Sequence, residues 1–232
     1  MNQEKIWDYF QTEGIDAFAE SKARLDFLFR KARTIAGGRR LKVLNIGAGN
    51  GWLERRCMGE GWETFSLDPS AKAIERLVEQ GISGRVGHME SMPFESGSFE
   101  VVFCSEVIEH LADQQMAEGI REVARVLAGS GSLIGSVPFR ENLSDGVAVC
   151  PECGKVFHRW GHQQSFDRKK LGAVLLQSGL SATETGTYAF LDFSKGTMRN
   201  RIGLSLHWIL GRAGIPIGTP TLYFIARKSS GR

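Results

Sequence analysis

The stretch VLNIGAGNGWL, residues 43–53, carries the strongest fold signal in this chain. Val43, Leu44 and Ile46 form an apolar run that is typical of a strand buried on both faces. The glycines at positions 47, 49 and 51 permit backbone conformations and a close ligand approach that a Cβ would prevent. A helix-compatible segment begins directly after them. A buried strand that passes through a glycine turn into a helix predicts a nucleotide-type ligand at the turn.

The spacing of these glycines separates two kinds of ligand. The dinucleotide fingerprint G-x-G-x-x-G requires its third small residue one position later, where this chain has Trp52. A bulky indole opposes close packing of the helix on the strand. The chain instead has G-x-G-x-G, followed by the strand-like segment WETFSLD, which ends in Asp68. A carboxylate at this position can accept two hydrogen bonds at once.

Strand-like and helix-like segments alternate along the chain. This alternation predicts a parallel sheet with right-handed crossovers. Ser70 and Asp167 are suitable N-caps, and Gly81 and Gly179 are suitable stops. The predicted order is a helix over 16–36, a strand over 41–46, a helix over 52–59, a strand over 62–68, a helix over 70–80, strands over 84–88 and 99–105, a helix over 113–128, a strand over 132–139, a helix from 167 to 179, and strands over 182–190 and 221–228.

Residues 40–139, in order, together with the final strand, resemble the class I S-adenosylmethionine (SAM) methyltransferases, including those of the ubiquinone pathway. The resemblance includes HMESMPFESGSFEVVF, residues 88–103, which is similar to the family's third-strand and fourth-strand block. It implies an α/β fold with a Rossmann-like, mostly parallel seven-stranded sheet and helices on both faces. It also implies that SAM is the cofactor and that Asp68 accepts hydrogen bonds from the two ribose hydroxyls. The implied cofactor-binding residues are Asn45, Gly47, Ala48, Gly49, Gly51, Asp68, Pro69, His88, Met89, Glu90 and Ser105.

Two positions depart from the family pattern. Asn45 stands where the family often has an acid, although its side chain keeps a hydrogen-bond acceptor. His88 stands where an Asp is usual. The resemblance therefore implies an adenine contact through the backbone N–H of Met89.

The segment SEVIEHL, residues 105–111, follows the fourth strand, at the edge where parallel sheets place their ligands. A helical turn would bring Glu106, Glu109 and His110 onto one face. E-x-x-E-H is similar to the metal motif of small-RNA 2′-O-methyltransferases and ubiquinone-pathway O-methyltransferases. The small-RNA enzymes add a further His after the fifth strand, and His162 occupies a comparable place here. The implied ion is catalytic Mg or Mn. In the alternative interpretation Glu106 and His110 only line the SAM pocket. We predict Glu106, His110 and His162 as the catalytic residues.

The segment CPECGKVFHRWGH, residues 150–162, offers a second metal site. Cys150, Cys153, His158 and His162 have the spacing C-x2-C-x4-H-x3-H, which resembles a zinc knuckle inserted after the fifth strand. Two thiolates and two imidazoles would complete a closed structural Zn site. The alternatives are unligated thiols, or a histidine of this loop acting as a general base. His162 cannot serve both metal sites.

Length and charge limit the class of protein. A chain of 232 residues fits one α/β domain, and a net charge of +3 gives no strong nucleic-acid signal. No apolar run approaches the roughly 18 residues of a transmembrane segment, and the N-terminus lacks the pattern of a secretion signal. We therefore expect a cytoplasmic protein. A basic amphipathic helix over 199–214 would either touch a membrane surface or, as we prefer, pack on the sheet or over the cleft.

We expect a single domain over residues 1–232, consisting of a helical cap (1–38), a SAM-binding core (40–139), a Cys/His insertion (140–165) and a C-terminal substrate-side half (166–232). The predicted function is O-methylation of a small molecule, glycan or lipid-linked intermediate by direct in-line methyl transfer. The alternatives are an RNA-modifying methyltransferase and a non-catalytic partner protein with the SAM fold.

Overall fold

A computed structural model describes residues 4–11, 13–14, 21–190 and 220–229. The segment 199–214 lies outside the described residues. Within them, no helix combines the length and the apolar character that crossing a membrane would require.

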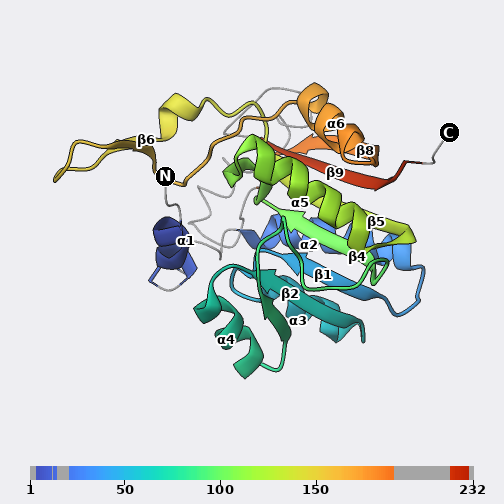
Figure 1. Cartoon of the computed structure of the whole chain (residues 1–232). Coiled ribbons are helices and arrows are strands. Elements are labelled where there is room, and N and C mark those ends of the chain that lie inside the picture. The colour runs from blue at the N-terminus through green and yellow to red at the C-terminus, as the bar shows by residue number, and fades with distance from the viewer. Residues whose placement is uncertain (1–3, 12, 15–20, 191–219, 230–232) are drawn as a thin grey trace, which may run out of the picture.

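One seven-stranded sheet organises the chain, with strand order β3-β2-β1-β4-β5-β9-β8 (Figure 1). Strands β1 to β5 are parallel, whereas β9 runs antiparallel to both β5 and β8. This confirms the mostly parallel seven-stranded sheet. The strands are β1 (Lys42–Ile46), β2 (Glu63–Asp68), β3 (Ser83–Val86), β4 (Phe99–Ser105), β5 (Leu127–Pro138), β8 (Leu180–Tyr188) and β9 (Thr221–Lys228).

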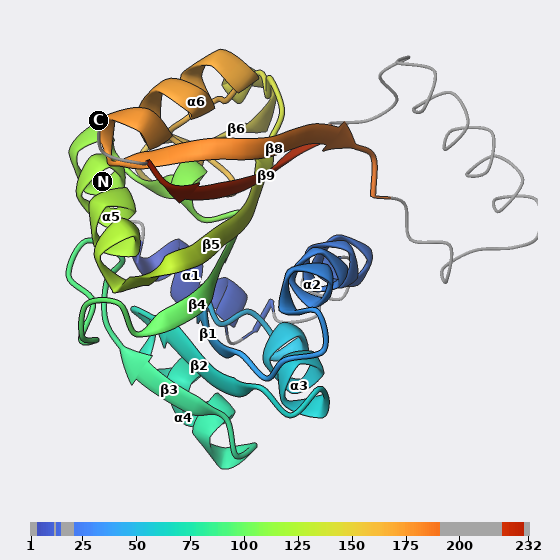
Figure 2. The ribbon, with the colours of Figure 1, turned by 90° about the vertical axis from the view of Figure 1, so that its right-hand side faces the viewer.

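Helices cover both faces of this sheet, with α2 and α3 on one side and α5 and α6 on the other (Figure 2). The helices are α1 (Glu4–Gln11), α2 (Lys22–Ala36), α3 (Trp52–Gly59), α4 (Ala71–Glu79), α5 (Asp113–Val126) and α6 (Arg168–Gln177). The predicted caps are confirmed, because the Ser70 side chain accepts from the Ala73 N–H and the Asp167 side chain from the Lys170 N–H.

Two hydrophobic clusters separate according to the alternation of side chains along the strands. Val43 and Phe103 belong to the cluster under α2 and α3, whereas Leu44 and Val102 belong to the cluster under α5 and α6. All four are at most 1% exposed. Because both faces are packed, the central strands are continuously apolar and hold their carboxyl ends in fixed positions.

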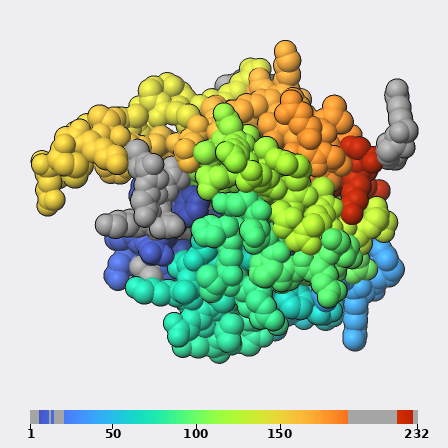
Figure 3. Space-filling model, viewed as in Figure 1, coloured from blue at the N-terminus to red at the C-terminus, as the bar shows by residue number. Residues whose placement is uncertain are grey.

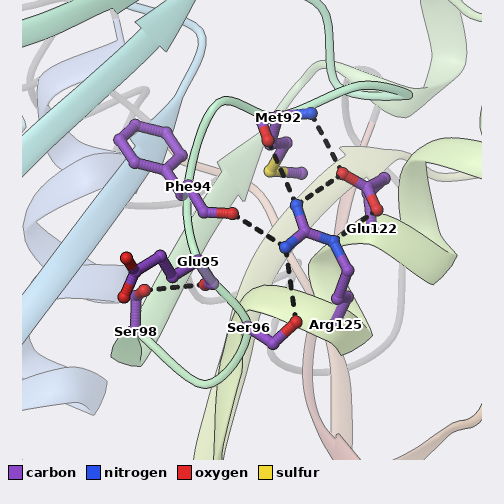
Figure 4. A network of polar contacts seen from close by, with 7 residues as sticks. All are labelled: Met92, Phe94, Glu95, Ser96, Ser98, Glu122 and Arg125. Carbon is purple, nitrogen blue, oxygen red and sulfur yellow. Dashed lines mark hydrogen bonds and ion pairs between the residues drawn. The ribbon is translucent and has the colours of Figure 1, made fainter.

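The loop between β3 and β4 is tied to α5 by Arg125 (Figure 4). Its guanidinium donates to the carbonyl oxygens of Phe94 at 2.7 Å and Met92 at 3.1 Å. Glu122 pairs with Arg125 at 2.6 Å and also accepts from the backbone N–H of Met92. This network fixes the loop that begins with His88 at the carboxyl end of β3.

The insertion after β5 contains one short helical turn and one two-stranded hairpin. It has a 3-10 turn, η3 (Leu143–Gly146), and a hairpin of β6 (Val147–Val149) and β7 (Val156–His158). Figure 3 shows the hairpin projecting away from the rounded body as a yellow arm. Val147, Val149 and Val156 on this hairpin are exposed.

Candidate functional site

A cavity of about 850 Å³ opens at the carboxyl ends of β1, β2 and β4. This is the edge at which open parallel sheets bind ligands. Residues of α1 and of the insertion complete its walls. The cavity is lined by all three predicted catalytic residues and by the predicted cofactor-binding residues Asn45, Gly47, Ala48, Gly49, Asp68, Pro69, His88, Met89, Glu90 and Ser105, whereas Gly51 is not among the lining residues.

The glycine turn after β1 depends on the absence of side chains. Gly47 has φ 89° and Gly51 has φ 74°, a region that other residues rarely adopt. A Cβ on Gly51 would lie 2.6 Å from Leu77 of α4, and a Cβ on Gly47 would lie 3.1 Å from Val107. The turn therefore presents bare backbone to the cavity.

A buried polar group supports the turn from behind. The Asn45 amide donates to the Gly47 carbonyl at 2.9 Å and to Glu54 Oε1 at 2.8 Å, and Ser66 Oγ donates to the same Glu54 oxygen. Glu54 is 1% exposed, and burial raises the pKa of its carboxyl. The amide of Asn45 thus shapes the turn. Sequence reasoning missed Glu54, because nothing in the helical pattern of α3 distinguishes it from a surface acid.

Asp68 ends β2 beside the turn and is 4% exposed. Its Oδ2 accepts from the Ala48 N–H at 2.8 Å, and its Oδ1 accepts from the Ser70 N–H at 2.8 Å. Burial is the main cause of the raised pKa of Asp68. A carboxylate has about four acceptor positions, and Gln11 Nε2 uses the second one on Oδ2, so Oδ1 keeps capacity for a ligand hydroxyl.

Helix α1 closes the cavity next to Asp68. Gln11 Nε2 donates to Asp68 Oδ2 at 3.2 Å. Arg76 of α4 binds the Gln11 carbonyl and also donates to the Gly49 carbonyl at 2.7 Å. Trp7 and Phe10 of α1 line the same space. A helical segment over 1–38 was expected, but the contact of Gln11 with Asp68 was not, because a polar residue near a chain end carries no sequence signal.

On the opposite wall, Met89 is 5% exposed and packs against α5. A Cβ on Gly119 of α5 would lie 2.9 Å from Met89 Cγ, so this glycine makes room for the methionine. His88 and Glu90 flank it on the cavity lining, and Gln115 Nε2 donates to Glu90 at 3.1 Å. The adenine contact of the Met89 N–H stays a prediction.

Glu106 does not lie on a helix with Glu109 and His110, contrary to the predicted shared face. Its φ is 55°, and only a single 3-10 turn, η2 (Ile108–His110), follows. The left-handed residue breaks the i, i+3, i+4 geometry. Glu106 Oε1 instead accepts from Ser136 Oγ at 2.8 Å and lies 3.9 Å from Arg24 Nε, still within the cavity lining.

Glu109 is a fully buried polar group, and His110 is half-buried with its Nδ1 atom inside the protein. Glu109 is 0% exposed, and neither carboxylate oxygen has a partner among the described residues. Burial, and then the charge of Glu106, raise the pKa of Glu109 well above its usual value. Burial, and then His162, lower the pKa of His110 to about 3, and its Nδ1 also has no partner in the described part of the chain. Buried polar groups without partners are rare and indicate a ligand or ion.

His162 completes this group. Ligand atoms of Glu109, His110 and His162 lie within 4.8 Å of one another, and the His110 and His162 rings meet edge to face at 4.8 Å. One carboxylate and two imidazoles form a donor set that fits a divalent ion. The structure therefore brings together Glu109, His110 and His162 of the predicted metal set, but Glu106 is not part of this group.

The four predicted zinc ligands do not meet. His158 pairs with Val147 at the base of the hairpin, whereas Cys150 and Cys153 lie in its turn, beyond the last paired residues. Among the described residues, His158 and His162 gather with Glu141, and neither cysteine belongs to a group of three ligating side chains. The ladder between β6 and β7 separates thiols from imidazoles, so the C-x2-C-x4-H-x3-H spacing does not give one tetrahedral site.

Comparisons with known proteins give the same picture as the geometry. Residues 44–135 match the family model described as a methyltransferase domain. The chain is 36% identical over 101 residues to a ubiquinone biosynthesis O-methyltransferase of Caulobacter, covering 40% of this chain and 39% of that protein. It is 30% identical over 138 residues to the ubiquinone biosynthesis O-methyltransferase of Xanthomonas oryzae, covering 56% and 55%. The chain thus spans about half the length, or less, of these relatives.

The fold is shared more widely. The crystal structure of the 1,6-didemethyltoxoflavin-N1-methyltransferase of Burkholderia thailandensis, with S-adenosylhomocysteine bound, superposes with a TM-score of 0.67 at 13% identity. The match covers 95% of this chain and 84% of that one.

Proposed function

Because residues 44–135 are a class I SAM-dependent methyltransferase domain, we propose that the chain transfers the SAM methyl group to a hydroxyl oxygen of a small molecule, glycan or lipid-linked intermediate. The proposal rests on one observation: the glycine turn and Asp68 line the same cavity as Glu106, His110 and His162. Cofactor-type and acceptor-type residues thus face the same space.

SAM is the cofactor, and the residues present fit it. Asp68 keeps acceptor capacity on Oδ1, and the Gly47 turn leaves space that a Cβ would fill. When bound, SAM supplies a methyl carbon that is already activated by its sulfonium. The chain must therefore chiefly hold donor and acceptor in line, because alignment provides most of the rate in such transfers.

The acceptor side then has to bind a hydroxyl and dispose of its proton. His162 and Glu106 line the cavity, and Arg24 beside Glu106 offsets the negative charge there. Glu109, His110 and His162 are the residues that would hold a divalent ion, which would lower the pKa of a coordinated hydroxyl. Without such an ion, His162 is the group able to accept the proton.

The acceptor classes also agree with the cavity walls. Phe10 of α1 and Trp160 of the insertion lie 5.1 Å apart between ring centroids, and both line the cavity. Such a wall suits a flat or ring-shaped acceptor. The ubiquinone-pathway relatives, named for O-methylation, support oxygen as the accepting atom.

The test uses SAM carrying a 13C-labelled methyl group, incubated with the purified chain and a cell extract, and the products are analysed with and without subsequent nuclease treatment. The carbon chemical shift of the product distinguishes methyl on oxygen, nitrogen and sulfur. We expect an O-methyl signal in the low-molecular-weight, glycan or lipid fraction. A product methylated only on nitrogen, or label that disappears after nuclease treatment, would refute the proposal.

A further inference from the structure

One carboxylate, that of Glu141, lies beside two histidine rings at the cavity wall. Its Oε2 is 2.6 Å from His162 Nδ1, and its Oε1 is 3.7 Å from His158 Nε2. The two rings stack at 4.7 Å with 21° between their planes. The side chains of His158 and His162 are 7% and 12% exposed. Glu141 belongs to no motif that the sequence revealed.

The hydrogen bonds assign the proton on His158. The backbone N–H of His162 donates to His158 Nδ1 at 3.1 Å, so this nitrogen must offer its lone pair. A neutral imidazole then carries its proton on the other nitrogen, Nε2, which faces Glu141. The same three side chains could be taken for a metal site, but a protonated Nε2 does not bind a metal.

The surrounding backbone is built closely around this ring. A Cβ on Gly146 would lie 1.9 Å from His158 Nε2, so only glycine leaves room for the imidazole. The Gly146 carbonyl accepts from the Arg159 N–H at 2.8 Å. On the other side, Ser165 Oγ donates to the Glu141 carbonyl at 2.7 Å. The position of Glu141 is therefore fixed from several directions.

The proton on His162 follows from Glu141. An ionised carboxylate only accepts hydrogen bonds, so His162 Nδ1 must donate at 2.6 Å. The lone pair of His162 is then on Nε2. That nitrogen is the one available to accept a proton or to bind an ion shared with Glu109 and His110.

We propose that Glu141 is a positioning residue which, through its 2.6 Å hydrogen bond, fixes His162 in the Nδ1–H tautomer and so keeps the Nε2 lone pair of His162 available to the reacting group. The effect of this tautomer on methyl transfer rests on the proposed function, since that function gives His162 its role toward the acceptor. The tautomer itself does not rest on the proposed function, because it depends only on contacts within the chain.

The direct test is nuclear magnetic resonance of protein labelled with 15N-histidine. The chain has only five histidines, and His162→Gln and His158→Gln assign the two rings. We expect His162 to carry its proton on Nδ1 in the wild type and to shift toward the Nε2–H form in Glu141→Gln. Glu152→Gln, which changes an exposed acid in the hairpin turn, is the matched control and should leave the spectrum unchanged. A wild-type His162 protonated on Nε2, or an unaltered tautomer in Glu141→Gln, would overturn the proposal.

Turnover adds a second readout. We expect Glu141→Gln to lower kcat about 10- to 100-fold, the usual effect of removing a carboxylate behind a working histidine, with KM for SAM unchanged. Glu141→Asp should recover part of the loss. Equal changes in kcat and KM for SAM, without recovery in Glu141→Asp, would mean that Glu141 only supports the fold. If no methyl transfer is found at all, the proposed function fails while the resonance experiment still decides the positioning role.

Discussion

Replacing Asp68 by Asn should separate cofactor binding from folding. The two side chains have the same shape, but the amide replaces one carboxylate oxygen by an NH2 group and removes the negative charge. In the wild type, the N–H groups of Ala48 and Ser70 each donate to a different oxygen of Asp68 at 2.8 Å. Whichever way the amide turns, its NH2 meets one of these donors, and only one oxygen can still accept from a ribose diol.

The expected loss follows from the hydrogen bonds that disappear. A hydrogen bond to a charged group contributes about 1.5–3 kcal/mol, so losing one ribose contact should weaken SAM binding by about 2–3 kcal/mol, or roughly 30- to 150-fold in Kd. The donor left facing the NH2 group should also lower the free energy of unfolding of the free protein by about 1–3 kcal/mol.

Isothermal titration of SAM measures the first effect, and thermal unfolding without SAM measures the second. Asp145→Asn, at an exposed acid in η3, is the matched control and should change neither quantity. A Kd for SAM within twofold of wild type in a folded Asp68→Asn protein would refute the assignment of Asp68 to the ribose.

Three further outcomes are expected. Gly51→Ala should lower the free energy of unfolding by about 1–3 kcal/mol, because alanine must adopt φ 74° with its Cβ 2.6 Å from Leu77. The control is Gly129→Ala, whose added Cβ meets open space. Equal melting temperatures of the two variants would contradict this expectation. In the presence of a chelator, Glu109→Gln should gain stability over the wild type as the pH rises above 4.5. The reason is that the raised pKa of Glu109 lets the folded wild type keep a proton that the unfolded chain loses. A difference in melting temperature between the two proteins that is constant with pH would exclude this. Cys150→Ser should leave the metal content of the purified protein and its melting temperature unchanged, since Cys150 shares no site with the histidines; a loss of stoichiometric zinc would restore the Cys and His site.

The fold was largely predictable because its strands are buried on both faces. Runs such as FEVVFCS, residues 99–105, and the glycine turn carry their signal locally, and both lie where they were expected. The boundary between α5 and β5 was predicted less accurately. The predicted helix over 113–128 ends at Val126, and β5 begins directly at Leu127, because Leu127 pairs with Phe99 of β4. Pairing between distant segments does not appear in the periodicity of either one.

The acceptor side was predictable by residue but not by geometry. His110 and His162 were expected to meet and do meet. The shared helical face of Glu106 and Glu109 was wrong, because the positive φ of Glu106 turns the chain before η2. Glu141 was missed, although an acid just after the fifth strand, at the carboxyl edge of the sheet, was a usable signal. Its role depends on His162, which approaches Glu141 only through the fold of the insertion.

The most direct test of the central claim is transfer of a radiolabelled methyl group from SAM by the purified chain into a fractionated cell extract, with Asp68→Asn as the negative control. The account predicts label in the small-molecule, glycan or lipid fraction, strongly reduced in the Asp68→Asn reaction. Label confined to RNA or protein, or equal labelling by both proteins, would contradict it.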